Sequence, residues 1–366
     1  MERSIGRAHR LPFGFEGDSY CHAASGGRRP HHGGTMQLKI ESESWAYKTP
    51  FRVSRGAEAA LDVVVVTLSD SHGHRGRGEA AGVDYDGETI PSLVAQIESI
   101  RPAIERGIAG AEMDFTALAA MLPAGGARNA VDCALWDLTA KRRRTSVWQL
   151  VQMPQPRALT TCITFGIDTD EAVVAGAHRY SGWPLIKVKV DGVRPLEAVR
   201  LVHGVSPASG IIVDPNQAWS CELLNRVAPE LESLGVVLVE QPVPRGQDET
   251  LRGYTGSIRL AADESVADRA GLAAVRDLYH LVNVKLDKAG GLTEALALAR
   301  DARDLGLGVM VGCMAGTSLA MAPAMVVGQL AAYADLDGPL LHAKDREHGI
   351  EYDRGRMRLP SSALWG

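Results

Sequence analysis

The spacing of hydrophobic and polar positions changes near residue 156, which divides the chain into two kinds of pattern. Before this point, alternating positions predict antiparallel strands and positions spaced by three to four residues predict helices. The strands are expected at 36–45 and 61–69, with a turn and a return strand after them, and the helices at 90–107, 114–121 and 127–150. We therefore expect residues 36–155 to form an α+β domain.

After residue 156, short apolar runs alternate with helical patterns. The runs lie at 159–167, 185–190, 210–214, 235–240, 258–263, 281–286, 308–314 and 331–337, and we expect helices in the gaps. Strands that alternate with helices favour a parallel sheet of the α/β class, and eight of them favour a (β/α) barrel over residues 156–340. A doubly wound open sheet is the rival, but no GxGxxG follows the first of these strands.

Composition narrows the class of protein further. Residues 1–35 are rich in Gly, Arg and His without an apolar period, which predicts a mostly disordered N-terminal extension. The net charge of −5 argues against a nucleic-acid partner. No apolar run approaches the roughly 18 residues of a membrane span. The five cysteines are scattered without a CxxC pair, which favours a reducing cytoplasm.

The segment "PLIKVKVDG" places Lys187 and Lys189 two residues apart in a β-branched run. Positions i and i+2 of a strand face the same side, so the two ammonium groups are expected to be neighbours. One explanation is a strand with one face exposed to solvent, with Ile186, Val188 and Val190 inside and the lysines in water. The other is a functional site.

Charged residues lie at the ends of most of the expected barrel strands. The carboxyl ends of parallel strands in a barrel meet at one mouth, so these residues are expected to lie together. They are Lys189, Asp214, Glu240, Asp263, Lys285, Asp335 and Asp337. Any one of the carboxylates could instead cap the helix after its strand. Three carboxylates on consecutive strands repel one another, and a hard cation such as Mg²⁺, or Mn²⁺, removes the conflict.

Two lysines on either side of such a site can remove a proton from one face of a carbon and return it to the other. A cation would stabilise the enolate that forms when a proton α to a carboxylate is removed. We expect the positive charge of Lys187 to depress the basicity of its neighbour. In this interpretation Lys187 is the tuning residue, and Lys189 and Lys285 are the catalytic residues.

The motifs "KVKV", "VDPNQAW", "VEQPV", "AADES" and "NVKLDKAGG" resemble, in this order, those of the muconate-lactonizing subgroup of the enolase superfamily. The resemblance spans almost everything after Met36. It implies an N-terminal capping domain, a modified TIM barrel of the (β/α)7β type, and a tail at 341–366 that returns to the cap. It also implies Mg²⁺ held by Asp214, Glu240 and Asp263.

Within the subgroup, "VGCMAGTSLA" and "YADLDGPLL" are most similar to the dipeptide epimerases. This similarity implies that Asp335 and Asp337 bind the α-ammonium group of a substrate. The alternative is that "DLDG" is only a turn. Asn216, Cys313 and Met314 are further candidates for substrate contacts, although packing explains Cys313 and Met314 equally well.

The loop "TPFRVSRGAEAALD" resembles the specificity loop of the subgroup. Members that act on Ala-Glu have an arginine where this chain has Glu58. Because a glutamate repels a carboxylate, this difference favours a cationic or neutral C-terminal residue. Arg52 and Arg55 in the same loop could still bind an acidic side chain.

The leading hypothesis is a Mg²⁺-dependent dipeptide epimerase that transfers the α-proton of the C-terminal residue between two lysines. The alternatives are a cycloisomerase, an o-succinylbenzoate synthase or an N-acylamino acid racemase with the same lysines. A third hypothesis is a catalytically silent barrel that serves as a binding protein. We expect a small-molecule dipeptide as the partner, a homo-oligomer, and no nucleic acid or membrane.

Overall fold

The described part of the chain comprises residues 36–53, 56–106, 115–153 and 155–366 of a computed structural model, without the side chains of residues 51–57. Residues Gly34–Gly366 belong to one compact unit. The predicted N-terminal extension at 1–35 and the loop residue Arg55 lie outside the described residues, so these two predictions remain as they stand.

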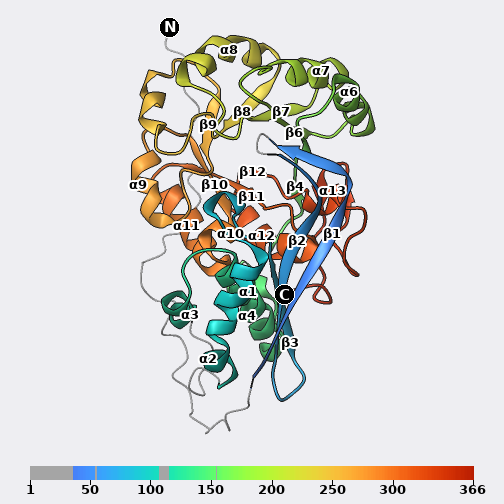
Figure 1. Cartoon of the computed structure of the whole chain (residues 1–366), viewed down its shortest axis with the longest axis vertical. Coiled ribbons are helices and arrows are strands. Elements are labelled where there is room, and N and C mark those ends of the chain that lie inside the picture. Colours follow the sequence, from blue (N-terminus) through green and yellow to red (C-terminus); the bar gives the residue numbers. More distant parts are fainter. Residues whose placement is uncertain (1–35, 54–55, 107–114, 154) are drawn as a thin grey trace. The chain divides into compact units, whose positions relative to one another are not determined.

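The cap begins with an antiparallel sheet of three strands, β1 (Gln37–Val53), β2 (Gly56–Ser69) and β3 (Arg75–Ala80). The long ribbon of β1 and β2 is blue in Figure 1. The strand predicted at 36–45 was too short, because β1 stays paired with β2 as far as the Val53–Gly56 pair. Helix α4 (Gly126–Arg143) packs directly on β3, where a Cβ on Gly78 would lie 2.1 Å from the carbonyl oxygen of Ala130.

The predicted cap helices are present but divided. The helix expected at 90–107 is α1 (Ile90–Ser99) followed by α2 (Arg101–Glu105), which has a proline in its first turn. The helix expected at 127–150 ends at Arg143 and resumes as α5 (Val147–Leu150), because Arg144 adopts a left-handed conformation with φ 50°. Helix α3 (Phe115–Met121) confirms the helix that was predicted at 114–121.

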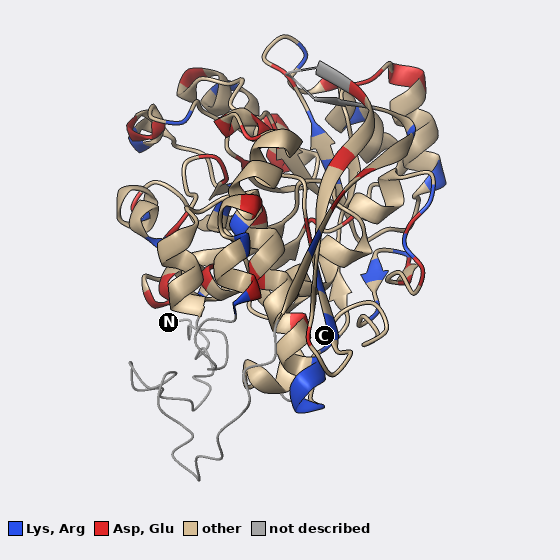
Figure 2. Cartoon of the chain, turned by 60° about the horizontal axis from the view of Figure 1, so that its bottom comes forward, with Lys and Arg blue, Asp and Glu red and all other residues tan. Residues whose placement is uncertain are grey.

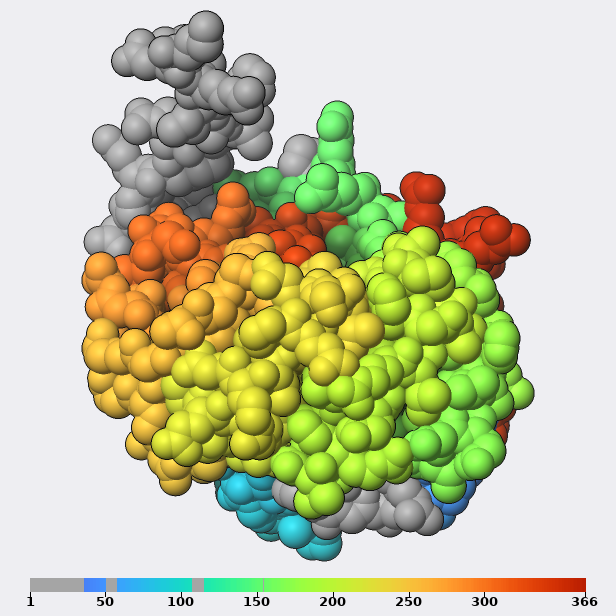
Figure 3. Space-filling model, turned by 90° about the horizontal axis from the view of Figure 1, so that it is seen from above, coloured from blue at the N-terminus to red at the C-terminus, as the bar shows by residue number. Residues whose placement is uncertain are grey.

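Eight parallel strands form the second sheet, in the order of the chain. They are β5 (Ile163–Phe165), β6 (Leu185–Lys189), β7 (Gly210–Asp214), β8 (Val236–Glu240), β9 (Arg259–Ala262), β10 (Leu281–Lys285), β11 (Gly308–Gly312) and β12 (Tyr333–Ala334). A parallel bridge between Thr161 and Ala334 joins the first strand region to the last, which closes the sheet into the predicted barrel. Figure 3 shows successive segments, from green through yellow to orange, around this part of the molecule.

The helices between the strands are α6 (Asp170–Arg179), α7 (Glu197–Val205), α8 (Cys221–Ser233), α9 (Leu272–Val275), α10 (Leu286–Ala289), α11 (Leu292–Asp304) and α12 (Ser318–Gly328). The expectation of a helix in every gap was wrong between β8 and β9, where the structure has only the 3₁₀ helix η2 (Asp248–Gly253). The strand expected at 159–167 is also two pieces, because β4 (Leu159–Thr160) pairs outside the barrel with β14 (Arg356–Met357).

Strand β6 decides between the two explanations of the lysine pair. Ile186 and Val188 are buried in the large apolar core that includes residues of the surrounding helices, whereas Leu185 belongs to a separate cluster of residues from the other barrel strands. Since alternate residues share a face, Lys187 and Lys189 point with Leu185 into the barrel. Lys187 is only 1% exposed, so the half-wet strand was the wrong explanation.

The last residues of the chain contact the cap. Helix α13 (Gly338–Leu341) is followed by the bridge between Tyr47 and His342, and the indole of Trp365 donates to the carbonyl of Cys133. A two-residue pair, β13 (Tyr352–Asp353) with β14, lies between them. The domain boundaries at residues 155 and 340 stay predictions.

Basic and acidic residues are interspersed over the described part of the chain, as the blue and red segments in Figure 2 show. Among the helices of the described residues, none is both long and apolar enough to cross a membrane.

Candidate active site

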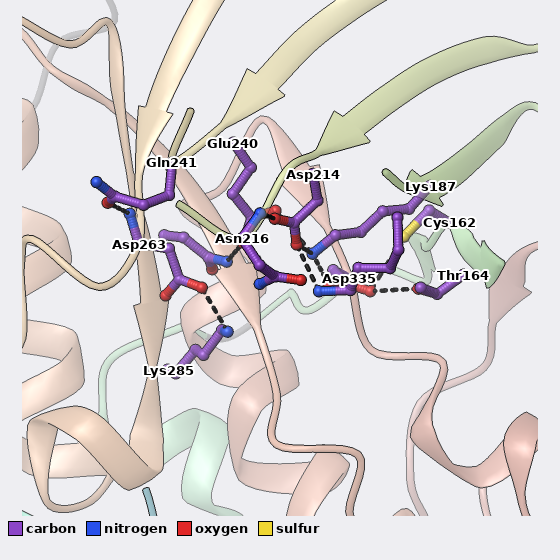
Figure 4. A network of polar contacts seen from close by, with 12 residues as sticks. Cys162, Thr164, Lys187, Asp214, Asn216, Glu240, Gln241, Asp263, Lys285 and Asp335 are labelled. Carbon is purple, nitrogen blue, oxygen red and sulfur yellow. Dashed lines mark hydrogen bonds and ion pairs between the residues drawn. The ribbon is translucent and has the colours of Figure 1, made fainter. Parts of the chain in front are cut away.

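The barrel brings the predicted charged residues to one end of its strands. Lys189 and Asp214 are the last residues of β6 and β7 and are paired in register. Glu240 ends β8, and Asp263 follows directly after β9. Lys285 ends β10. The carboxyl ends of adjacent parallel strands meet at one edge, which explains why residues so far apart in sequence form one network (Figure 4).

Lys187 lies at the centre of one half of this network. Its Nζ is 2.7 Å from Asp335 Oδ2, 2.7 Å from Glu240 Oε2 and 3.0 Å from Asp214 Oδ2. Lys189 Nζ lies 2.6 Å from the same oxygen of Asp214. The strand therefore uses two lysines to balance carboxylates that come from three other strands.

The electrostatics follow from this geometry. Burial alone would lower the pKa of Lys187, but the charges of Asp214, Asp335 and Glu240 outweigh it and raise this pKa well above its ordinary value. Burial raises the pKa of Glu240 to about 8. The tuning role of Lys187 stays a prediction.

The other half of the network is built around Asp263. Lys285 Nζ lies 2.6 Å from Asp263 Oδ2, and Lys288 Nζ lies 2.7 Å from Oδ1 of the same carboxylate. Lys288 also donates to the carbonyl oxygens of Val266 and Asn283 at 2.9 and 3.0 Å. The two lysines outweigh the effect of burial and hold the pKa of Asp263 well below its usual range.

Sequence reasoning missed Lys288 and Gln241. The side-chain oxygen of Gln241 accepts from the backbone N–H groups of Asp263 and Ser265 at 2.9 and 3.1 Å, which fixes the end of β9 against the end of β8. The only signal was its place directly after Glu240 in "VEQPV". The only signal for Lys288 was its place in the motif "NVKLDKAGG", three residues after Lys285.

The two aspartates after β12 have different surroundings. Asp335 lies 3.2 Å from the sulfur of Cys162, accepts from the hydroxyl of Thr164 at the same distance, and pairs with Lys187. Asp337 accepts from the backbone N–H of Thr164 at 2.6 Å. Burial, followed by the charge of Asp335, raises the pKa of Asp337 to about 7. These contacts go beyond those of a plain turn.

A cavity of about 640 Å³ lies over the network, between the barrel strand ends and the cap. The predicted site residues that line it are Glu58, Lys189, Asn216, Asp263, Lys285, Cys313 and Met314. Lys187 is buried beneath, with Asp214, Glu240 and Asp335, the three carboxylates that it contacts. The structure thus places Lys189 and Lys285 on one cavity, with three strands between their own.

The donor set on β7, β8 and β9 contains only oxygen, which suits a hard divalent cation. Among the described residues, no three His, Cys, Asp or Glu side chains form a ready metal cage, since lysine ammonium groups lie between the carboxylates. Glu240 Oε2 is buried without a hydrogen bond, although Lys187 is near it. The carboxylates already surround a positive charge, so their chemistry fits a cation.

Comparison with known families identifies the class of protein. Residues 35–151 match the N-terminal domain of mandelate racemase and muconate lactonizing enzyme, and residues 171–363 match the enolase C-terminal domain-like family. The chain belongs to the enolase superfamily, in the group with these two domains. The expected fold, a modified TIM barrel with an N-terminal capping domain, is confirmed.

Individual relatives cover nearly the whole chain. The L-Ala-D/L-Glu epimerase of Escherichia coli K12 is 39% identical, over 88% of this chain and 99% of its own length. The N-acetyl-D-glutamate racemase of a Pseudoalteromonas species is 38% identical, over 83% and 95%. A crystal structure from Agrobacterium tumefaciens, with homology to dipeptide epimerases and with sodium and L-Ala-L-Glu bound, has a TM-score of 0.86 at 37% identity and covers 90% of this chain and 100% of its own.

Proposed function

We propose that this protein is a Mg²⁺-dependent epimerase of dipeptides, an isomerase that inverts the α-carbon of the C-terminal residue. The single observation that carries the proposal is that Lys189 and Lys285 line one cavity beside the carboxylate-rich strand ends. The relatives support it, because they include L-Ala-D/L-Glu epimerases and a Methylococcus capsulatus dipeptide epimerase solved with Mg and L-Arg-D-Lys.

In this proposal Asp214, Glu240 and Asp263 hold the cation. Bound Mg²⁺ would supply stabilisation of the negative charge that develops on the substrate carboxylate. The chain itself supplies the proton transfer. One of the lysines removes the α-proton with its neutral Nζ, and the other returns a proton from its ammonium form to the opposite face of the carbon.

The two aspartates after β12 distinguish between substrates. The pKa of Asp337 is raised because its buried negative charge is poorly compensated next to Asp335, and a substrate ammonium group would compensate it. This supports a dipeptide with a free α-ammonium group. The names of the relatives also favour an epimerase over a cycloisomerase or an o-succinylbenzoate synthase.

A racemase of N-acylated amino acids is the second candidate, and the Pseudoalteromonas relative favours it. Its substrates lack the ammonium group, so Asp337→Asn separates the two functions. The variant should lose most activity on dipeptides and keep activity on N-acetyl amino acids. Full dipeptide activity in Asp337→Asn would contradict the role of Asp337.

The test of the proposed function is incubation with Mg²⁺ and pooled L,L-dipeptides in D₂O, with mass spectrometry of the recovered compounds. We expect a gain of one mass unit at the α-carbon, which is lost when EDTA removes the cation. Exchange of N-acetyl amino acids alone would establish the second candidate. Absence of Mg²⁺ binding in calorimetry, together with no exchange, would support a silent barrel. A homo-oligomer, a cytoplasmic location and the absence of nucleic-acid and membrane partners stay predictions.

A further inference from the structure

Glu79 is a buried carboxylate of the cap that lies outside the cavity lining and has no part in the proton transfer described above. It is the second-last residue of β3 and is only 1% exposed. Its two oxygens accept from the backbone N–H and the hydroxyl of Thr317 and from Nε and Nη2 of Arg346. The bonds from the N–H, Nε and Nη2 are 2.7, 2.9 and 2.6 Å long. These donors fix the carboxylate in one orientation.

Thr317 connects Glu79 to the wall of the cavity. It is the last residue of the loop at 313–317 between β11 and α12, and residues 313–315 of this loop line the cavity. A Cβ on Gly316 would lie 2.9 Å from Oε1 of Glu79, so the carboxylate also lies close to the backbone of the loop. Because protein interiors are close-packed, a change at this carboxylate is expected to move the loop.

The loop has a conformation that needs support from outside. Ala315 has a φ of 58°, a left-handed conformation that residues other than glycine rarely adopt. Its carbonyl oxygen accepts from Nε2 of His342 at 2.7 Å, and the His342 ring is stacked on Tyr47 of β1 with the ring centres 5.0 Å apart. The cap and the tail thus hold the loop at Ala315 as well as at Thr317.

Arg346 holds Glu79 from the side of the tail. Its Nη2 lies 2.6 Å from Glu79 Oε2 and 2.7 Å from Glu43 Oε2 on β1. Its Nε donates to the hydroxyl of Thr317 at 2.6 Å, and its guanidinium lies 4.9 Å from the centre of the Trp45 ring. The positive charge that compensates Glu79 therefore comes from the tail, and the cap, the tail and the loop meet at one ion pair.

The loop lies beside groups of the proposed reaction. Burial raises the pKa of the Cys313 thiol, and the charges of Asp335 and Asp337 raise it further. Lys189 and Lys285 line the same cavity as the loop. The position of the loop therefore limits where a substrate can lie relative to the two lysines. A misplacement of about 1 Å can lower the rate of a reaction about a hundredfold.

We propose that Glu79 is a positioning residue, which holds the loop at 313–317 through Thr317 and so fixes the substrate between Lys189 and Lys285. This inference rests on the proposed epimerase function and adds a residue that acts on the reaction through the loop. Loss of the Glu79 charge should release the loop. It should lower kcat more than it raises KM, because the groups that bind the substrate and the cation stay in place.

The first test is kinetic and uses the dipeptide that the wild type labels fastest in the pooled D₂O assay. Glu79→Gln keeps the size of the side chain and removes its charge. We expect it to lower kcat for α-deuterium exchange about 10- to 100-fold, with KM changed by less than about threefold. Thr317→Val should lower kcat several-fold, whereas Thr317→Ser keeps the hydroxyl and should keep the wild-type kcat.

Asp137→Asn is the matched control for a loss of stability. Asp137 is also a buried carboxylate of the cap, and it accepts from the backbone N–H groups of Arg77 and Gly366. It is outside the cavity lining. The control variant should lower the melting temperature and leave kcat unchanged.

The second test does not depend on activity. Cys313 in the loop and Cys221 on α8 are both partly exposed thiols, so their labelling by iodoacetamide can be compared within one chain by peptide mass spectrometry. Glu79→Gln should raise the labelling rate of Cys313 several-fold relative to Cys221, because the loop opens more often. Asp137→Asn should leave this ratio unchanged.

The outcomes separate this inference from the proposed function. If the wild type exchanges a dipeptide and Glu79→Gln lowers only the melting temperature, Glu79 has a structural role alone and the epimerase remains. An equal loss of kcat in Asp137→Asn, or an unchanged Cys313 labelling ratio in Glu79→Gln, would also overturn the inference. If the wild type exchanges no dipeptide, the proposed function fails and the positioning role fails with it.

Discussion

Two pairs of lysines lie at the mouth of the barrel. The pairs are arranged alike, but different groups compensate the positive charges of their buried members. On β6, Lys189 lines the cavity and Lys187 is buried beneath it. On the opposite side of the donor strands, Lys285 lines the cavity and Lys288 is buried on α10. Each lysine that can reach a substrate therefore has a buried lysine next to it.

The difference lies in what each buried lysine contacts. Lys187 contacts three carboxylates, and their charges raise its pKa. Lys288 contacts one carboxylate and backbone carbonyls, and burial lowers its pKa. Lys187 thus joins carboxylates from several strands by its positive charge. Lys288 instead fixes the loop after β9 through Asp263 and Val266. The same residue type therefore has two structural tasks in one site.

The largest expected effect comes from the two lysines that line the cavity. Lys189→Ala and Lys285→Ala should each lower the rate of epimerisation by at least about 10³-fold, because each removes a group that carries the proton on one face of the carbon. The measurement is epimer conversion by chiral chromatography. Circular dichroism melts serve as the control for folding. If a variant keeps more than a tenth of the wild-type rate, the lysine that it lacks does not transfer the proton.

The buried lysines should differ in their effect on stability. Lys187→Met leaves three carboxylates near one another without their shared counter-ion and should cost about 3–5 kcal/mol. Lys288→Met should cost less, because Asp263 keeps its contact with Lys285. Urea unfolding of both variants in EDTA measures the difference. Added Mg²⁺ should restore the stability of Lys187→Met more than that of Lys288→Met. The reverse order would show that Lys187 is not the main counter-ion of the three carboxylates.

A smaller, pH-dependent effect is expected at Asp287, which lies between Lys285 and Lys288 in the chain. Its carboxylate accepts from the backbone N–H groups of Ala81 and Gly82 in the cap, and burial raises its pKa to about 7. A carboxyl group whose pKa is raised by folding stabilises the fold below its unfolded pKa. This contribution is lost as the pH rises from about 4 to about 7.

Asp287→Asn removes this titration and keeps an acceptor oxygen. We expect the free energy of unfolding of the wild type to fall by about 1–3 kcal/mol more than that of the variant between pH 5 and pH 8. Denaturant titrations at several pH values measure both slopes. Parallel slopes would show that Asp287 does not titrate as its burial implies.

Much of the site could be predicted because barrel strands place their ends together. Asp214, Glu240 and Lys285 each end an apolar run, and that pattern alone located them. The wrong predictions concern segments whose structure depends on contacts with distant parts of the chain and not on the local pattern of apolar residues. The segment 159–167 looks like one strand, but its first residues pair with the distant β14, a contact that periodicity cannot reveal.

The contacts of the buried residues beneath the site could also not be predicted from the sequence. Lys288 and Glu264 are adjacent to recognised motif residues, yet nothing in their spacing shows that one is saturated with acceptors and the other has no donor. These properties depend on which backbone carbonyls turn toward the site. The roles assigned to individual site residues stay predictions until variants are measured.

The proposed reaction requires two lysines that act on opposite faces of one carbon. The most direct measurement starts from a single dipeptide epimer in D₂O and follows deuterium in both epimers at early times. Two separate lysines predict that the newly formed epimer carries deuterium while the remaining starting epimer still carries mostly hydrogen. A product that retains the original hydrogen, or equal early labelling of both epimers, would contradict a reaction that uses two lysines.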